Sequence, residues 1–283
     1  MAIEKILIIG AGQMGGGIAQ VAAQNSYKVM VFDISEAQIE KLQKSIAKAF
    51  ARMVEKGKAT VEQVAEWTAN ISYGVDLEAL APLADLVIEA ATENLKIKLE
   101  TFAKLDKLCK PDCILASNTS SISITVIAAV TKRPDKVIGM HFFNPVPVMK
   151  LLEIISNPST SNEVFAACKE VGIALGKTIV EVKDSPGFAV NRILIPMINE
   201  AIMVLQEGVA TAADIDAAMV NGANHPIGPL ALADLIGNDT NLAIMQVLYN
   251  EFQDPKYRPA LLLKQMVAAG KLGRKTGEGF FKY

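Results

Sequence analysis

The chain has 283 residues, which is enough for one large domain or two ordinary ones with a substantial apolar core. Its charge is nearly balanced, with 28 Lys and Arg against 30 Asp and Glu, and this excludes a strongly basic protein of the kind that holds nucleic acid. No apolar run approaches the roughly 20 residues that cross a bilayer. A strand begins almost at the first residue, so we expect no signal peptide and a cytoplasmic location.

The cysteines are odd in number, at Cys109, Cys113 and Cys168. Cys109 and Cys113 could suggest a metal pair, but neither of the two histidines lies near them in the sequence. We therefore expect free, buried thiols in a reducing compartment and no metal site.

Up to about residue 184, short apolar runs alternate with helical stretches. We expect strands at residues 5–9, 28–32, 86–89, 113–117, 137–140, 151–155 and 178–182. Helices are expected at residues 15–25, 35–56, 95–108 and 162–175. Such alternation predicts an α/β fold with a doubly wound, mostly parallel sheet.

Beyond residues 184–187 (Asp-Ser-Pro-Gly) the strand pattern ends. Apolar periodicity predicts helices at residues 189–206, 212–219, 230–236, 241–252 and 259–269. The sequence therefore predicts a sheet domain at 1–184 and an all-helical C-terminal domain at 185–283.

The segment 35–56 is too long for an ordinary crossover helix, and a further helix is expected around 61–68. Together they predict a helical arm at about residues 35–70, after the second strand. Basic residues spaced three or four apart share one face of this arm: Lys41, Lys44, Lys48, Arg52 and Lys56. This face could be solvated, with ion pairs such as Glu40 with Lys44, or it could contact a phosphorylated ligand.

A glycine-rich loop follows the first expected strand, where residues 10–15 read Gly-Ala-Gly-Gln-Met-Gly and lead into a helix. Gly10 permits the tight turn, Gly12 lets the backbone approach a pyrophosphate, and Gly15 allows close packing of helix and strand. The phosphates would lie at the helix N-terminus, where unpaired N–H groups and the dipole favour negative charge. The sequence therefore predicts a Rossmann-type dinucleotide site.

Asp33 ends the next expected strand, where an acid can accept hydrogen bonds from both hydroxyls of the adenosine ribose. Its charge would repel a 2′-phosphate, and no arginine follows it closely. NAD is therefore favoured over NADP. The alternative is that Asp33 only caps the helix that begins near Ser35.

His141 ends the expected strand at 137–140, and a proline-rich loop follows it. If the chain reverses through this loop, Glu153 at the start of the next strand returns to the same edge of the sheet. A histidine takes the hydroxyl proton in an alcohol oxidation, and a carboxylate fixes its tautomer. A glutamate inside an apolar strand also needs a partner, so we expect His141 and Glu153 to meet.

Other polar residues have two interpretations each. Ser120 lies in the loop after the strand at 113–117, where its hydroxyl could hold a substrate oxygen or help to cap the next helix. Asn191 opens the helical domain and could complete a site or bond backbone. His225 precedes a proline and has no acid at useful spacing, so we expect a structural role or a place in a cleft wall.

These segments resemble the short-chain 3-hydroxyacyl-CoA dehydrogenase family, and within it the bacterial 3-hydroxybutyryl-CoA dehydrogenases. The resemblance covers essentially the whole chain and is most specific around His141, where residues 139–145 read Gly-Met-His-Phe-Phe-Asn-Pro. Further matching segments are residues 10–15, 116–121, 186–192, 224–229 and 273–280.

The resemblance implies that His141 is the general acid/base, that Glu153 orients it, and that Ser120 and Asn191 hold the 3-oxygen of an acyl-CoA substrate. Contacts with NAD are implied for Glu93, Lys98, Asn144 and Lys275. The family also implies the (S)-3-hydroxy stereoisomer and a homodimer formed through the helical domain.

Contacts with coenzyme A are implied for Lys56 and for Ser120. Some relatives have a serine on the same arm where this chain has Ala49. Coenzyme A is therefore expected to be bound differently or less tightly on that side.

Two other functions are alternatives to this prediction. A dehydrogenase of free hydroxyacids would use a lysine on the first helix of the second domain, but residues 190–203 contain none, and Arg192 cannot titrate usefully. A non-catalytic nucleotide-binding protein would have no reason to retain His141, Glu153, Ser120 and Asn191 together. We therefore predict an NAD-dependent enzyme that oxidises a 3-hydroxyacyl-CoA, with 3-hydroxybutyryl-CoA as substrate, and catalyses the reverse reduction.

Overall fold

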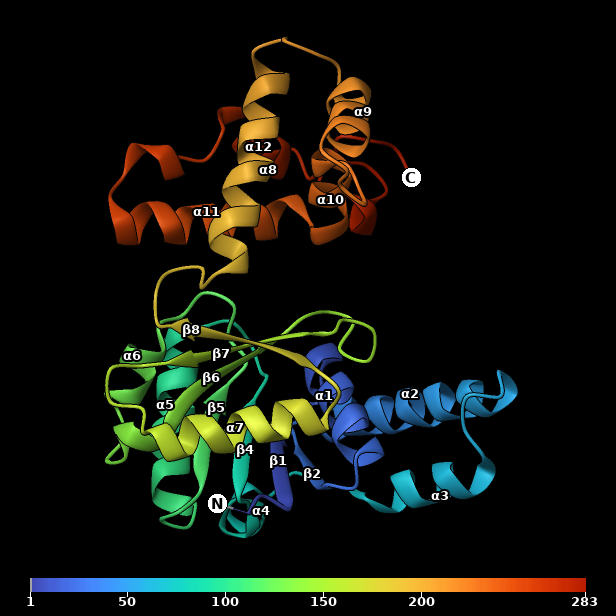
Figure 1. The fold of residues 1–283 in the computed structure, drawn as a ribbon, viewed down its shortest axis with the longest axis vertical. Coiled ribbons are helices and arrows are strands. Elements are labelled where there is room, and N and C mark those ends of the chain that lie inside the picture. Colours follow the sequence, from blue (N-terminus) through green and yellow to red (C-terminus); the bar gives the residue numbers. More distant parts are fainter. Residues whose placement is uncertain (1) are drawn as a thin grey trace. The chain divides into compact units, whose positions relative to one another are not determined.

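The computed structural model describes residues 2–283. This part of the chain divides into two compact units, one ending at Asp184 and the other beginning at Ser185 (Figure 1). Within residues 2–283 no helix has the length and apolar content that a bilayer span requires. The three cysteines are free and buried, as predicted.

The first unit is built on one sheet of eight strands among the described residues. They are β1 (Lys5–Ile9), β2 (Lys28–Phe32), β3 (Ile71–Gly74), β4 (Leu86–Glu89), β5 (Ile114–Ser117), β6 (Val137–Phe142), β7 (Leu151–Ser156) and β8 (Thr178–Lys183). Their order is β3-β2-β1-β4-β5-β6-β7-β8. Only β6 and β7 pair antiparallel among these neighbours. Because β1 lies between β2 and β4, its carboxyl end is at the switch point where doubly wound sheets bind ligands.

Helices cover this sheet and extend it. They are α1 (Gln13–Gln24), α2 (Glu36–Glu55), α3 (Val61–Ala69), α4 (Leu77–Leu80), α5 (Leu95–Leu108), α6 (Ile124–Ala128) and α7 (Asn162–Ala174). The inner strands are buried on both faces, so that Ile6, Leu7 and Ile8 of β1 are all 0% exposed. Helix α1 packs its own Ile18 into the same core. Burial of each such side chain contributes about 1.5–3 kcal/mol.

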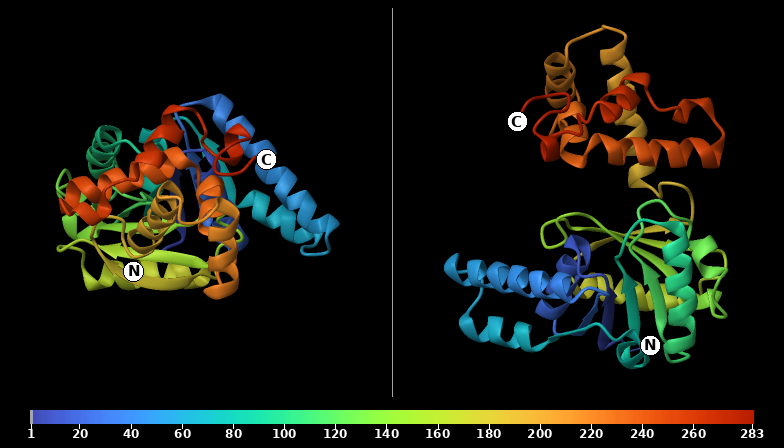
Figure 2. Two further views of the ribbon diagram at one scale, coloured as in Figure 1. Left: turned by 90° about the horizontal axis from the view of Figure 1, so that it is seen from above. Right: turned by 180° about the vertical axis from the view of Figure 1, so that it is seen from behind.

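The helical arm consists of α2 and α3, which lie side by side and project beyond the sheet (Figures 1 and 2). Helix α2 buries Leu42, Ile46 and Phe50, which recur every four residues along one face. Phe50 packs against Trp67 of α3, with ring centroids 5.4 Å apart. The basic residues of α2 are all exposed, and among the described residues no ion pair joins Glu40 to Lys44.

The second unit is all-helical in the part that the structure describes. It contains α8 (Val190–Gln206), α9 (Ala212–Gly222), α10 (Pro229–Ile236), α11 (Asn238–Phe252) and α12 (Leu261–Ala268), with a short 3-10 turn η4 (Arg274–Thr276). Its hydrophobic core includes Ile198, Ile202, Leu230 and Met245. Buried Asp234 accepts hydrogen bonds from the backbone N–H groups of Phe280 and Phe281 and so anchors the C-terminal segment.

The predicted fold class is confirmed: a doubly wound, mostly parallel sheet with a helical arm precedes a helical unit. Two details differ. Strand β3 lies at the sheet edge and has no fully buried residue, so its apolar pattern is weak. Strand β6 runs two residues further than expected, to Phe142, because its pairing with β7 carries the polar His141 inside the ladder.

Candidate active site

The glycine loop connects β1 to α1 as a tight turn. Gly10 has a φ of +108°, and a side chain there would meet the carbonyl oxygen of Ala90 at 2.8 Å. A Cβ on Gly15 would lie 1.9 Å from the carbonyl oxygen of Gly10, so only glycine allows the helix to start this close to the strand.

Gly12 faces open space. A Cβ built on it would meet none of the described atoms within 4 Å, and none of the described side chains caps the N-terminus of α1 at this residue. The first turn of α1 carries no acidic residue, which leaves its helix dipole available to an anion. The residues present therefore fit the pyrophosphate of a dinucleotide.

Asp33 follows β2 and is tied to the loop. Its Oδ2 accepts a hydrogen bond from the N–H of Ala11 at 2.8 Å, and its Oδ1 accepts one from the N–H of Ser35 at 3.0 Å. Ser35 is itself the N-cap of α2. Asp33 thus does brace the start of α2, but each carboxylate oxygen has a second lone pair that can receive a ribose hydroxyl. The capping and ribose-binding interpretations are compatible.

His141 and Glu153 lie opposite each other in the antiparallel pair β6–β7. The Nδ1 atom of His141 is 2.8 Å from Oε2 of Glu153, and the two residues are 4% and 0% exposed. Neighbouring parallel strands bring this pair to the same carboxyl edge as the glycine loop. The ring of Phe143 packs on His141, with centroids 4.5 Å apart. A buried imidazole held by a carboxylate can exchange a proton at its other nitrogen.

Ser120 lies in the loop after β5, and the Glu93 carboxylate holds this loop. Oε1 of Glu93 accepts hydrogen bonds from the backbone N–H of Ser120 at 2.9 Å and from the hydroxyl of Thr119 at 2.6 Å. Burial raises the pKa of Glu93, but the charge of Lys98 and the hydrogen bonds from Thr119, Ser120 and Ser121 outweigh burial and bring the pKa below its ordinary value. Glu93 is therefore ionised at neutral pH.

Lys98 is 1% exposed and lies beneath this loop, on α5. Its Nζ is 2.8 Å from both carboxylate oxygens of Glu89 and 3.4 Å from Oε2 of Glu93. Sequence reasoning treated Glu89 only as the last residue of a strand and missed this ion pair. The signal that could have found it is an acid that ends a wholly apolar strand, since a buried carboxylate requires a partner.

Asn118 was also missed as a bracing residue. Its side-chain Oδ1 accepts a hydrogen bond from the backbone N–H of Phe142 at 2.8 Å, and its backbone N–H donates to the carbonyl of Glu89 at 2.7 Å. The ends of β4, β5 and β6 are therefore joined beside His141.

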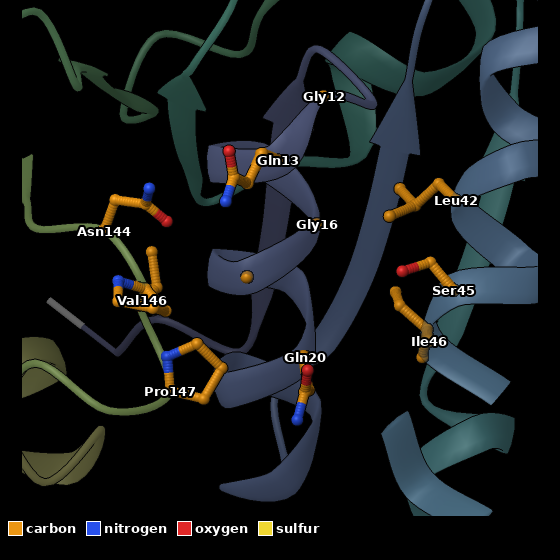
Figure 3. Close-up of a pocket in the computed structure, with 12 residues that line it drawn as sticks. Gly12, Gln13, Gly16, Gln20, Leu42, Ser45, Ile46, Asn144, Val146 and Pro147 are labelled. Carbon is orange, nitrogen blue, oxygen red and sulfur yellow. The ribbon is translucent and has the colours of Figure 1, made fainter. Parts of the chain in front are cut away.

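A groove of about 180 Å³ runs along α1, between the arm and the loop that follows β6 (Figure 3). Asn144 and Val146 form one wall, and Leu42 and Ser45 of α2 form the other. Gly17 has room only for hydrogen here, because a Cβ on it would lie 2.9 Å from Val146 Cβ. Lys56 is the C-cap of α2, the helix that lines the groove. Ala49 lies on the same helix and is half-buried.

The other predicted residues belong to the second unit. Asn191 is buried in the first turn of α8. Lys275 lies in η4 and bonds both carboxylate oxygens of Asp239, at 2.5 and 2.6 Å. His225 lines an apolar pocket with Val190, Leu194 and Met197 of α8. That Asn191 and Lys275 join the site of the first unit remains a prediction.

The fold and the glycine loop define the class of Rossmann-type dinucleotide-binding proteins. Residues 5–185 match the family model described as 3-hydroxyacyl-CoA dehydrogenase, NAD binding domain, and residues 187–283 match the model of its C-terminal domain. The chain belongs to the 3-hydroxyacyl-CoA dehydrogenase family. The predicted family, enzyme class and cofactor are thereby confirmed.

Individual relatives agree over the full length. A 3-hydroxybutyryl-CoA dehydrogenase of Clostridioides difficile is 51% identical and covers 99% of each chain. One from Bradyrhizobium diazoefficiens is 49% identical over 99% of this chain and 96% of its own. The crystal structure of (S)-3-hydroxybutyryl-CoA dehydrogenase from Ralstonia eutropha superposes with a TM-score of 0.97 at 52% identity, covering 100% of this chain and 99% of the other.

Proposed function

We propose that the chain oxidises the 3-hydroxyl of (S)-3-hydroxybutyryl-CoA and reduces acetoacetyl-CoA in the reverse direction. The observation that carries this is the buried contact of 2.8 Å between His141 and Glu153 at the edge of the sheet that also bears the glycine loop. The names of relatives that are about half identical support the choice of substrate.

The proposed proton transfer follows from the orientation of the imidazole. A carboxylate can only accept hydrogen bonds, so Glu153 holds the proton of His141 on Nδ1 and leaves Nε2 to take the proton of the 3-hydroxyl. As Nε2 becomes protonated, the Glu153 charge stabilises the imidazolium. In the reverse reduction, Nε2 returns the proton to the 3-oxygen.

Binding and orientation of the substrate are assigned to Ser120 and Asn191. Their side chains would hold the 3-oxygen so that its proton faces His141. The reacting groups would then already be in position, which lowers the entropic part of the activation barrier. When bound, NAD⁺ would accept the hydride in the oxidation, and NADH would supply it in the reduction. The residues that would hold it in the first unit are Gly10, Gly12, Gly15, Asp33, Glu93, Lys98 and Asn144, with Lys275 from the second unit.

Lys98 would act on NAD through Glu93, because its own amine is buried in the pair with Glu89. Lys56 and the exposed basic face of α2 would receive the phosphates of coenzyme A, since none of these lysines has an ion pair that competes among the described residues. The homodimer that the family resemblance implies would form through the second unit, where Ile193 and Leu261 are exposed apolar side chains, at 72% and 59%.

Turnover of acetoacetyl-CoA tests the proposed function. We expect purified protein to consume NADH when this thioester is added, as measured by the fall in absorbance of the reduced nicotinamide. Free acetoacetate at the same concentration is the control, and we expect slow or absent turnover with it, because the free acid cannot use the basic face of α2. Turnover of the free acid without turnover of the thioester would instead support a hydroxyacid dehydrogenase.

Asp33 is expected to set the choice between NADH and NADPH. The variant Asp33→Ala removes the charge that repels a 2′-phosphate and the acceptor for the ribose hydroxyls. The ratio of kcat/KM for NADH to that for NADPH should therefore fall. An unchanged ratio would mean that another residue carries the selectivity. Thermal unfolding should be recorded alongside, because Asp33 also accepts two backbone N–H groups.

A further inference from the structure

A charge cluster lies under the loop that carries Ser120: Glu89 and Lys98 are buried, and the more exposed Glu93 completes it. Glu89 ends β4, pairs in register with Ser117 of β5 and is 1% exposed. The cluster places two carboxylates around one ammonium group. Such pairs gain little stability over apolar packing, because the desolvation of the charges offsets their attraction. A role in geometry is therefore a better explanation than a role in stability.

Among the described residues, each group that hydrogen-bonds the Glu89 carboxylate is a donor. Oε1 accepts from the N–H of Ala91 at 2.9 Å and from Lys98, and Oε2 accepts from Lys98 and from the hydroxyl of Ser117 at 2.8 Å. An amide in place of the carboxylate would turn an NH₂ group toward at least one of these donors. The site therefore requires a charged, acceptor-only side chain.

Two routes lead from Glu89 to Ser120. Lys98 connects Glu89 to Glu93, whose Oε1 accepts the backbone N–H of Ser120 at 2.9 Å. The hydroxyl of Ser117 connects Glu89 to the loop itself, because it accepts the N–H of Thr119 at 3.2 Å. These routes tie the Ser120 loop to the end of a strand that lies beside the glycine loop.

We propose that Glu89 is a positioning residue, which sets the place of the Ser120 hydroxyl by holding Lys98 and Ser117. Glu89 acts on the substrate only through this loop. The proposal rests on the proposed function, in which Ser120 holds the 3-oxygen.

The test is a cycle of Glu89→Gln and Ser120→Ala, with kcat for acetoacetyl-CoA measured at saturating NADH. We expect Glu89→Gln to lower kcat by about tenfold or more, the equivalent of one charged hydrogen bond. In the Ser120→Ala background the same change should have little further effect, because the hydroxyl that Glu89 positions is gone. Equal fold-changes in the two backgrounds would overturn the proposal, as would a wild-type kcat in Glu89→Gln.

Two further variants keep the test decisive. Ser117→Ala removes the hydroxyl of the second route without altering charge, so it should lower kcat. This loss should disappear in the Ser120→Ala background. The variant tests the proposal even if Glu89→Gln fails to fold. Asp106→Asn weakens the Arg133–Asp106 ion pair (2.8 Å) of the same unit, whose side chains are 15% and 7% exposed. It should lower the unfolding temperature and leave kcat unchanged. A similar loss of kcat in Asp106→Asn would show that any weakened ion pair slows the enzyme.

Failure of the proposed function would be recognised separately. It would appear as absent turnover of acetoacetyl-CoA by the wild-type protein, before any variant is compared. Failure of the positioning role would leave wild-type turnover and the Ser120→Ala defect in place.

Discussion

His141→Gln is expected to reduce turnover of acetoacetyl-CoA by about 10²–10⁴-fold, the range that general acid–base catalysis contributes. Glutamine occupies a similar volume and can still bond to Glu153, but it cannot donate a proton to the 3-oxygen. Binding of NADH, measured by its fluorescence, should be unchanged because His141 is assigned no cofactor contact. Near-wild-type turnover in this variant would refute the proton-transfer assignment.

Glu153→Gln is the matched variant for the partner. It keeps the shape of the side chain in the β6–β7 pair and removes the charge that stabilises the imidazolium. We expect a loss of kcat smaller than that of His141→Gln, because the imidazole is retained. A combined variant should be no slower than His141→Gln alone, since Glu153 acts through His141. A further loss in the combined variant would indicate an independent role for Glu153.

Gly12→Ala and Gly15→Ala are expected to fail in different ways. At Gly12 the backbone is extended, with φ −75°, and an added Cβ meets none of the described atoms within 4 Å. Stability should therefore stay the same, while the methyl group occupies the space for the pyrophosphate. Displacing the pyrophosphate would cost at least one hydrogen bond from the backbone to a charged phosphate, and NADH binding should therefore weaken by about 10- to 100-fold.

At Gly15 the added Cβ would lie 1.9 Å from the backbone oxygen of Gly10. This clash cannot be relieved by a side-chain rotation, so the free energy of unfolding should fall by about 1–3 kcal/mol or more. Thermal unfolding and NADH titration together distinguish the two variants. Wild-type NADH affinity in Gly12→Ala would show that no phosphate lies over this residue.

Much of the fold could be predicted because its signals are local. Helix α5 begins and ends where the apolar spacing indicated, after the N-cap Asn94, and the long α2 follows its N-cap Ser35. The edge strand β3 was missed because half-buried positions leave no strong apolar run. The extra length of β6 was missed because a polar histidine interrupts the pattern of a buried strand.

The sequence by itself determined the glycine loop, the acid after β2 and the candidate proton carrier, because each depends on residue types at short spacing. The meeting of His141 with Glu153 was also expected, on the condition that the chain reverses between them, and the structure supplies the antiparallel register that meets this condition. Only the tertiary structure decided which other distant groups meet: the bond from Asp33 to Ala11, and the burial of Lys98 between Glu89 and Glu93. The physical reason is that such contacts depend on strand register and on the close packing of separate elements. Neither quantity is encoded in any single segment of the chain.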